Sequence, residues 1–159
     1  MKLFPLLILF ISLCSFLSIS CNRHRYNPEK ITIRPRVFVA GSIPVPIVDE
    51  YDFIDVQLGT IANILTDDPD DRIYALWFNL DRRSAISIQK ETLRNKGKNL
   101  HLVVAGEVVG IHPIEKMISN GVIPFVLSSQ LDEINALKLY KGMKSSIKEL
   151  QAELKAHKG

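Results

Sequence analysis

The amino terminus carries the feature that most limits how this chain can fold. A single charged residue, Lys2, precedes an apolar run from Leu3 to Ile19, and Ser20 then leads into Cys21. This layout is typical of a bacterial secretory signal, which is cleaved off and takes no part in the mature fold. Cleavage before Cys21 would remove 20 of the 159 residues and leave 139, enough for one domain with tails.

Cys21 is the candidate lipidation site, because the small Ser20 before it suits the narrow pocket of a signal peptidase. Two or more acyl chains would anchor a domain stably, since each buried methylene contributes roughly 0.8 kcal/mol. Two alternatives stay open: cleavage with release, and an uncleaved anchor, for which the 17 residues from Leu3 to Ile19 are short. We expect a lipid-anchored protein on the periplasmic face of a cell-envelope membrane.

Cysteine content and charge limit the fold and the partners further. Cys21 would be the only cysteine left after cleavage, so no intramolecular disulfide can form and the core alone must hold the fold. The whole chain has 20 basic and 17 acidic residues, and only Lys2 lies in the leader, which leaves a net charge of +2. Nucleic-acid binding needs a clustered basic face. We therefore expect no nucleic-acid partner.

The pattern of apolar residues predicts a mixture of strands and helices. Residues 22–30 are polar and read as a tether, and residues 53–65 fit a strand or a helix, of which we favour the strand. Turns are expected at Gly106-Glu107 and Asn120-Gly121, and Gly142 is expected to end a helix. The remaining strands are predicted at 31–39, interrupted by Pro35, and at 73–80, 100–105, 108–111 and 122–127, and the helices at 82–95, 129–141 and 145–156.

These elements predict an α+β fold, with a small antiparallel or mixed sheet and helices on one face, as in ferredoxin-like arrangements. The predicted organisation has four parts. They are a signal peptide at 1–20, the lipidated cysteine and tether at 21–30, the α+β domain at 31–142, and an amphipathic C-terminal helix at 143–159.

The stretch from Tyr74 to Gly142 carries an ordered series of short motifs. They are Leu80-Asp81, Thr92, Gly97-Lys98, the strand and turn at 100–109, Pro113, the turn at 118–121, Asp132-Glu133 and Gly142. In this order they resemble the head subdomain of the first periplasmic domain of SecD, the accessory subunit of the bacterial protein translocase. The resemblance implies a SecD-head-like fold and a surface for extended polypeptide.

The chain also departs from that family. Ala105 stands where the family has Asp, and the segment 110–113 is one residue longer. No polytopic segment follows residue 21, so we expect the chain to lack the proton-driven membrane half of SecD and not to power translocation itself. Fold alone does not carry function.

No motif indicates catalysis or a metal site. The carboxylates of Asp67, Asp68, Asp70 and Asp71 lack the alternating spacing of a calcium loop, so a solvated turn is favoured. The histidines at 24, 101, 112 and 157 are not spaced as zinc ligands, and the serines at 84, 128 and 129 lie in no nucleophile elbow. We therefore expect no catalytic residue, no metal and no cofactor.

Two groups of apolar residues are candidates for binding a partner. Trp77 and Phe78 are adjacent in a predicted strand, so one should enter the core while the other faces outward as a recognition surface. Ile147, Leu150 and Leu154 form one helical stripe, which must pack on its own domain, a second copy or a protein partner.

The leading hypothesis is a non-catalytic envelope lipoprotein that binds a protein partner or an unfolded segment, as an accessory to protein export or envelope assembly. The alternatives are an envelope enzyme, for example one that acts on the cell wall, and a structural subunit that assembles through its C-terminal helix.

Overall fold

The computed structural model describes residues 26–63, 66–68 and 71–157. The predicted signal peptide, Cys21 and residues 21–25 of the predicted tether lie outside the described residues, as do Pro69 and Asp70 of the acidic turn. The elements are η1 (Pro28–Lys30), β1 (Arg36–Val39), β2 (Phe53–Ala62), β3 (Arg72–Leu80), α2 (Arg82–Arg94), β4 (Asn99–Val104), β5 (Glu107–Pro113), β6 (Val122–Leu127) and α3 (Glu133–His157).

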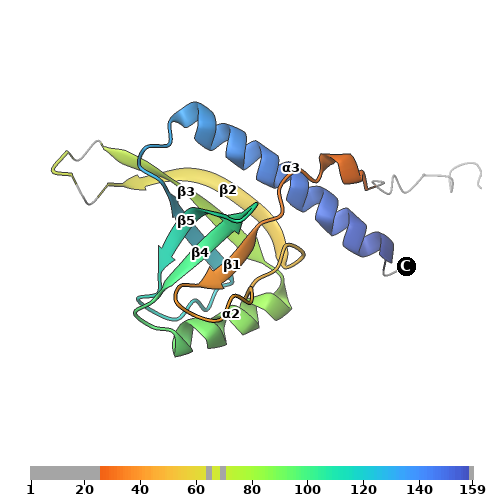
Figure 1. Cartoon of the computed structure of the whole chain (residues 1–159), viewed down its shortest axis with the longest axis horizontal. Coiled ribbons are helices and arrows are strands. Elements are labelled where there is room, and N and C mark those ends of the chain that lie inside the picture. The colour runs from red at the N-terminus through yellow and green to blue at the C-terminus, as the bar shows by residue number, and fades with distance from the viewer. Residues whose placement is uncertain (1–25, 64–65, 69–70, 158–159) are drawn as a thin grey trace, which may run out of the picture.

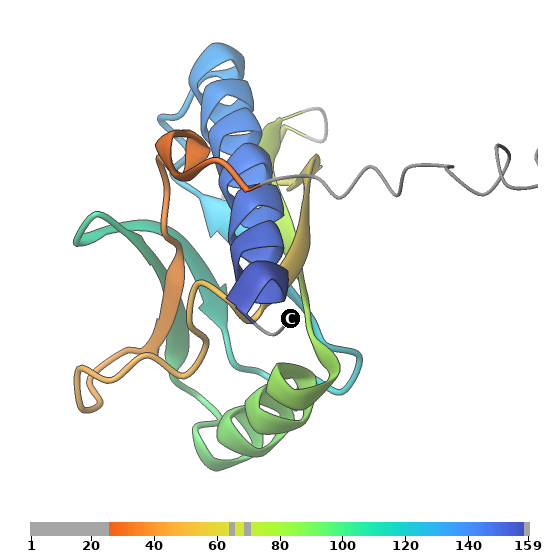
Figure 2. The ribbon, with the colours of Figure 1, turned by 90° about the vertical axis from the view of Figure 1, so that its right-hand side faces the viewer.

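The strands form one six-stranded sheet in the order β1-β4-β5-β6-β3-β2, and every neighbouring pair is antiparallel. The sheet curves, and α3 lies across its open, concave side near edge strand β2 (Figures 1 and 2). Helix α2 lies at the far end of the sheet from α3 (Figure 1). The predicted α+β class with a C-terminal helix is confirmed.

The core fills the concave side of the sheet. Three aromatic rings form its centre: Phe53 and Phe78 lie 4.9 Å apart between centroids, and Phe78 and Phe125 lie 5.8 Å apart edge to face. Aromatic pairs in this geometry contribute beyond the burial of their area. Around them are buried Val37, Val56, Leu76, Ile88, Leu100, Leu102, Ile123, Met143 and Ile147, which come from every strand except β5 and from both α-helices.

The ambiguous segment 53–65 is a strand as far as Ala62. It pairs with β3 from Phe53 opposite Leu80 to Ala62 opposite Arg72, with one irregularity after Phe53. The helical interpretation is wrong because the partner strand satisfies the backbone of the segment and leaves its alternate side chains on two faces.

The two predicted turns differ from expectation. Between β4 and β5, Val104 pairs with Glu107, so the turn residues are Ala105 and Gly106, with φ of 51° and 87°. The turn is therefore one residue earlier than predicted. Both residues have positive φ, which a two-residue hairpin of this kind requires.

The Asn120-Gly121 turn is not a tight hairpin. Strand β5 ends at Pro113 and β6 begins at Val122, and the connection between them docks beside α2 through the buried Ile114 and Ile118. Gly121 does have a positive φ of 69°, but its role is close packing, because a Cβ there would lie 2.8 Å from the Cβ of Ala85.

Helix α3 is continuous from Glu133 to His157, so the predicted stop at Gly142 is wrong. Asp132 accepts a hydrogen bond from the Asn135 N–H at 2.8 Å and caps the start of the helix. Gly142 lies inside the helix where Ile33 crosses it: a Cβ at 142 would lie 2.8 Å from Ile33 Cδ1. A local stop signal is overridden here by the need for a close crossing.

Residues 31–34, predicted as part of a strand, instead form an arm against α3. The N–H groups of Thr32 and Ile33 donate to Ser146 Oγ at 3.1 and 3.0 Å. These donors are satisfied by the helix rather than by a neighbouring strand, so only Arg36–Val39 joins the sheet.

Candidate functional site

Trp77 and Phe78 lie on opposite faces of β3, as expected for adjacent residues of a strand. Phe78 is fully buried in the aromatic centre of the core. Trp77 lies on the other, convex face and is half-buried. Phe78 is therefore excluded from a partner surface, while Trp77 remains a candidate.

The surroundings of Trp77 on the convex face are mainly apolar. Strand pairing places Pro124 directly opposite Trp77, and Val126 opposite Ala75 and Ile111. In the described part of the chain, no helix covers this face (Figures 1 and 2). We call the following set the convex patch: Ile61, Ile73, Ala75, Trp77, Ile111, Pro124 and Val126.

Exposure varies within the convex patch. Ile111 is 42% exposed, Ala75 is only 1% exposed, and the other members are half-buried. The patch spans strands β2, β3, β6 and β5, so it is contiguous across the middle of the sheet. A contiguous apolar face with a partly exposed tryptophan is a common feature of sites that bind proteins.

Gly59 of β2 holds the ring of Trp77 in place. A Cβ at Gly59 would lie 2.8 Å from Trp77 Cζ3 and 3.3 Å from Cη2, so the ring lies directly over the glycine. Glycine weakens a strand, but here it allows an aromatic side chain of the neighbouring strand to lie close to the backbone. A glycine in a strand paired with a tryptophan strand was the signal that could have indicated this contact.

Strand β2 borders the convex patch and is one edge of the sheet. Gln151 of α3 covers its beginning, where the amide Nε2 donates to the carbonyl of Phe53 at 2.8 Å. Farther along, Gln57 and Thr60 are exposed, and among the described residues no backbone hydrogen bond joins the outer side of 56–62 to another segment. Such an edge can accept an added strand.

The opposite edge, β1, is partly closed. The N–H of Val37 donates to the carbonyl of Val48 at 2.9 Å, and the N–H of Ile47 donates back to Val37 at 2.8 Å. The open strand edge therefore lies next to the convex patch rather than on the far side of the sheet.

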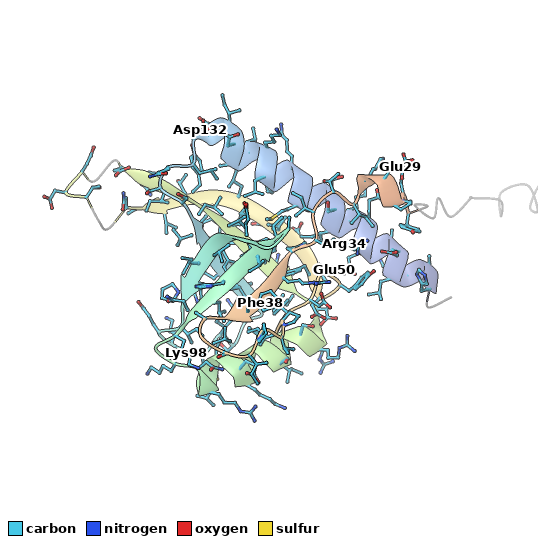
Figure 3. All side chains as sticks on the ribbon, in the orientation of Figure 1. Glu29, Arg34, Phe38, Glu50, Lys98 and Asp132 are labelled. Atoms are coloured by element: carbon cyan, nitrogen blue, oxygen red, sulfur yellow. The ribbon has the colours of Figure 1, made fainter. Side chains whose placement is uncertain are left out.

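A buried carboxylate, Glu50, lies near edge β1 and is fully engaged in ion pairs. Glu50 is 5% exposed and accepts hydrogen bonds from Arg34 and, at 3.2 Å, from Nη2 of Arg36. Arg36 also donates through Nε to Asp49 at 3.1 Å. Arg34 and Glu50 point toward each other in Figure 3. A hydrogen bond with Tyr51, and then one with Glu50, raises the pKa of Arg34 above its ordinary value. This cluster fastens the arm to the loop before β2.

The helical stripe predicted to bind a partner mostly packs on its own domain. Ile147 is 2% exposed and Leu150 is fully buried, whereas Leu154 is half-buried. Ile147 and Leu150 are therefore not available to a partner in the folded domain, because they face the concave side of the sheet. Internal packing, one of the predicted alternatives, is what the structure shows for these two residues.

The histidines and serines considered for chemistry are dispersed. His112 lies on the concave side, 6.5 Å from the Phe125 ring, where burial lowers its pKa below the ordinary 6.5. His101 is half-buried in β4, His157 is exposed at the end of α3, and His24 lies outside the described residues. Within residues 26–63, 66–68 and 71–157, no group of three or more His, Cys, Asp or Glu side chains could hold a metal ion.

A shallow hollow of about 240 Å³ lies between the α2–β4 turn and the end of β5. It is lined by residues 96–99 and 113–115, and its ionisable side chains, Lys96, Lys98 and Glu115, are all exposed. Among the described helices, none has the length and apolarity needed to cross a bilayer.

No family model and no curated protein matches this chain. The solved structures that are similar include one of SecDF, a membrane component that enhances protein export, and one of SecDF in its super-membrane-facing form. Each has a TM-score of 0.47 and 16% sequence identity over 68% of this chain. The chain covers 41% of the first solved chain and 12% of the second, less than half of either.

Proposed function

We propose that this chain is a non-catalytic envelope lipoprotein, anchored through Cys21, whose domain binds an extended segment of a protein partner. The observation that carries the proposal is the convex patch around Trp77, which lies beside the open edge strand β2. The bound segment would add to β2 and place side chains against the patch.

The two features suit one ligand because they supply different parts of its recognition. An open strand edge forms main-chain hydrogen bonds with a bound segment whatever the sequence of that segment is. An adjoining apolar surface contacts every second side chain of the segment and so selects for apolar residues there. Gln57 of β2 pairs directly with Trp77, so a strand added along β2 would run one strand spacing, roughly 5 Å, farther out. Trp77 then offers a large aromatic surface at the centre of the contact.

A binding role is favoured over catalysis by what the fold exposes. The convex patch is apolar and offers no group for acid–base chemistry. The buried carboxylate of Glu50 is already paired with the guanidinium groups of Arg34 and Arg36. The ordered motifs over 74–142, which resemble the SecD head, support a partner that is an unfolded segment during protein export or envelope assembly.

The leader supports the anchor. The apolar run ends at Ser20-Cys21, and element η1 begins at Pro28, seven residues after Cys21. An acylated Cys21 would therefore hold the domain close to a membrane on its periplasmic side.

Photocrosslinking in living cells tests the proposed surface. A photoreactive amino acid is placed in the full chain at Gln57 or at Ile61, which lie on edge strand β2 and on the same face of the sheet as Trp77. The matched control position is Leu93 of α2, an apolar residue that is 65% exposed away from the patch. We expect crosslinks to polypeptide from positions 57 and 61 that weaken when Trp77→Ala is added. Equal crosslinking from position 93, or no effect of Trp77→Ala, would refute the proposed surface.

A further inference from the structure

The outward side of α3 carries a row of lysines. Lys141, Lys144, Lys148 and Lys155 are all exposed. At 100° per residue their spacings of three, four and seven place them within an arc of about 60° on the helix. The row extends about 20 Å along the axis. We call these four residues the lysine row.

The other sides of α3 are occupied differently. Met143, Ile147 and Leu150 are buried in the domain, so the row faces away from the core. Of the helix carboxylates, Glu149 is 2% exposed and accepts from Asn27, and Glu153 is half-buried and accepts from the Tyr51 hydroxyl at 3.2 Å.

Some negative charge remains near the row. Asp55 lies 3.6 Å from Lys144 Nζ, Asp132 and Glu133 are exposed at the start of α3, and Glu29 is exposed on η1. Lys138 and Lys30 are also exposed. The central and C-terminal part of the outward side of α3 is therefore predominantly positive.

The chain enters the domain beside this same helix. The N–H of Asn27 donates to Glu149 Oε2 at 2.8 Å, and Thr32 and Ile33 donate to the buried Ser146. Element η1 accordingly lies against α3 (Figures 1 and 2). Cys21 is six residues before Asn27, a distance of at most about 20 Å even for fully extended chain.

We propose that the lysine row lies on the membrane surface and binds the phosphates of anionic lipid headgroups. The proposal rests on the anchor at Cys21: a short tether that is fastened to α3 keeps this helix, rather than the far end of the domain, next to the bilayer. A lysine close to an anionic membrane surface raises membrane partitioning by about fivefold.

Docking through the lysine row would orient the domain. Helix α3 covers the concave side of the sheet, whereas the convex patch lies on the opposite face. With α3 on the bilayer, Trp77 on the opposite face of the sheet would remain open to polypeptide in the aqueous compartment, whereas Asp55 keeps the beginning of β2 close to the row. The anchor would then set both the distance and the direction of the proposed binding surface.

Lysine footprinting on vesicles tests the docking. The full-length protein produced in a bacterium is reconstituted into vesicles of phosphatidylcholine alone or of equimolar phosphatidylcholine and phosphatidylglycerol. A membrane-impermeant amine reagent then labels the lysines, and mass spectrometry gives the labelling rate of each. Lys96 and Lys98 are the internal references, because their turn lies at the end of the domain remote from α3 (Figure 3).

On the anionic vesicles we expect labelling of the lysine row to fall at least about fivefold relative to Lys96 and Lys98, with recovery in detergent. Equal rates for the row and the references, or equal protection on phosphatidylcholine alone, would overturn the docking proposal. If the protein does not float with either kind of vesicle, the anchor of the proposed function fails instead, so the two failures are distinguishable.

A pair of charge-matched variants checks the role of the row. Lys141→Gln/Lys148→Gln/Lys155→Gln removes three of its charges, and Arg83→Gln/Lys90→Gln/Lys116→Gln removes three exposed charges elsewhere while it keeps both reference lysines. We expect Lys144 to lose its protection on anionic vesicles in the first variant only. Retained protection in the first variant, or an equal loss in both, would contradict the proposal.

Discussion

Replacing Gly59 by valine tests whether the Trp77 ring depends on the bare backbone of β2. The new Cβ would lie 2.8 Å from Trp77 Cζ3, so the ring must leave its place or the strands must separate. Overpacking of this kind costs roughly 1–3 kcal/mol. Valine itself favours a strand over glycine by about 0.5–1 kcal/mol, which offsets part of the cost. We expect a net loss of about 1–2 kcal/mol in the free energy of unfolding.

The same substitution in a Trp77→Ala background isolates the contact. Without the ring, Gly59→Val should be neutral or stabilising by up to about 1 kcal/mol, because only the strand preference remains. The difference between these two effects predicts a coupling energy of about 1–3 kcal/mol between the positions. Urea denaturation followed by circular dichroism measures each of the four stabilities.

Tryptophan fluorescence gives an independent readout, since Trp77 is the only tryptophan in the chain. We expect the emission of the Gly59→Val variant to shift to longer wavelength as the ring becomes more exposed to water. The Trp77 ring does not pack on Gly59 if Gly59→Val lowers the free energy of unfolding equally with and without the ring, or if it leaves the emission unchanged.

Three further predictions concern other parts of the chain. Gly121→Val should destabilise the domain by about 1–3 kcal/mol in urea denaturation, because of the positive φ and the 2.8 Å approach to Ala85; an unchanged midpoint would contradict this packing. Burial lowers the pKa of His112 in the folded protein below 6.5, so the unfolded chain binds a proton at His112 more readily than the folded protein does. The free energy of unfolding should therefore decrease as the pH falls below 6.5. A His112→Gln variant should show a flatter dependence of melting temperature on pH, and an identical dependence would exclude His112 as its cause. Cys21→Ala should move the full-length protein out of the membrane fraction or leave it unprocessed, and an unmodified Cys21 in the wild-type protein by mass spectrometry would contradict lipidation.

Several elements could be predicted from the sequence because their signals are local. Strands β3, β4, β5 and β6 and helix α2 lie close to their predicted positions, since runs of apolar residues and capping residues act over a few neighbours. Asp81 is an example: its carboxylate accepts from the Ser84 N–H at 2.7 Å and caps α2. The α+β class follows from these elements together.

The candidate surface needed the tertiary structure. Alternation in β3 predicted that Trp77 and Phe78 face opposite ways, but either face could have been the core. The choice is made by the partners: Phe78 packs with Phe53 and Phe125 beneath α3, which leaves Trp77 on the uncovered face. Pairing with β3 likewise decides that Phe53–Ala62 is a strand, although its apolar spacing also fits a helix.

Two glycines show most clearly where local signals stop. At Gly121 the chain does take the positive φ that Asn-Gly favours, yet the hairpin is absent because Ile114 and Ile118 are buried beside α2. At Gly142 the sequence by itself indicates a helix end, but the helix continues and the glycine admits the crossing of Ile33. Local sequence determines which backbone conformations have a low free energy at a residue. Contacts between distant segments determine which of them is used, because burial of apolar side chains outweighs the roughly 1 kcal/mol preference of a single residue.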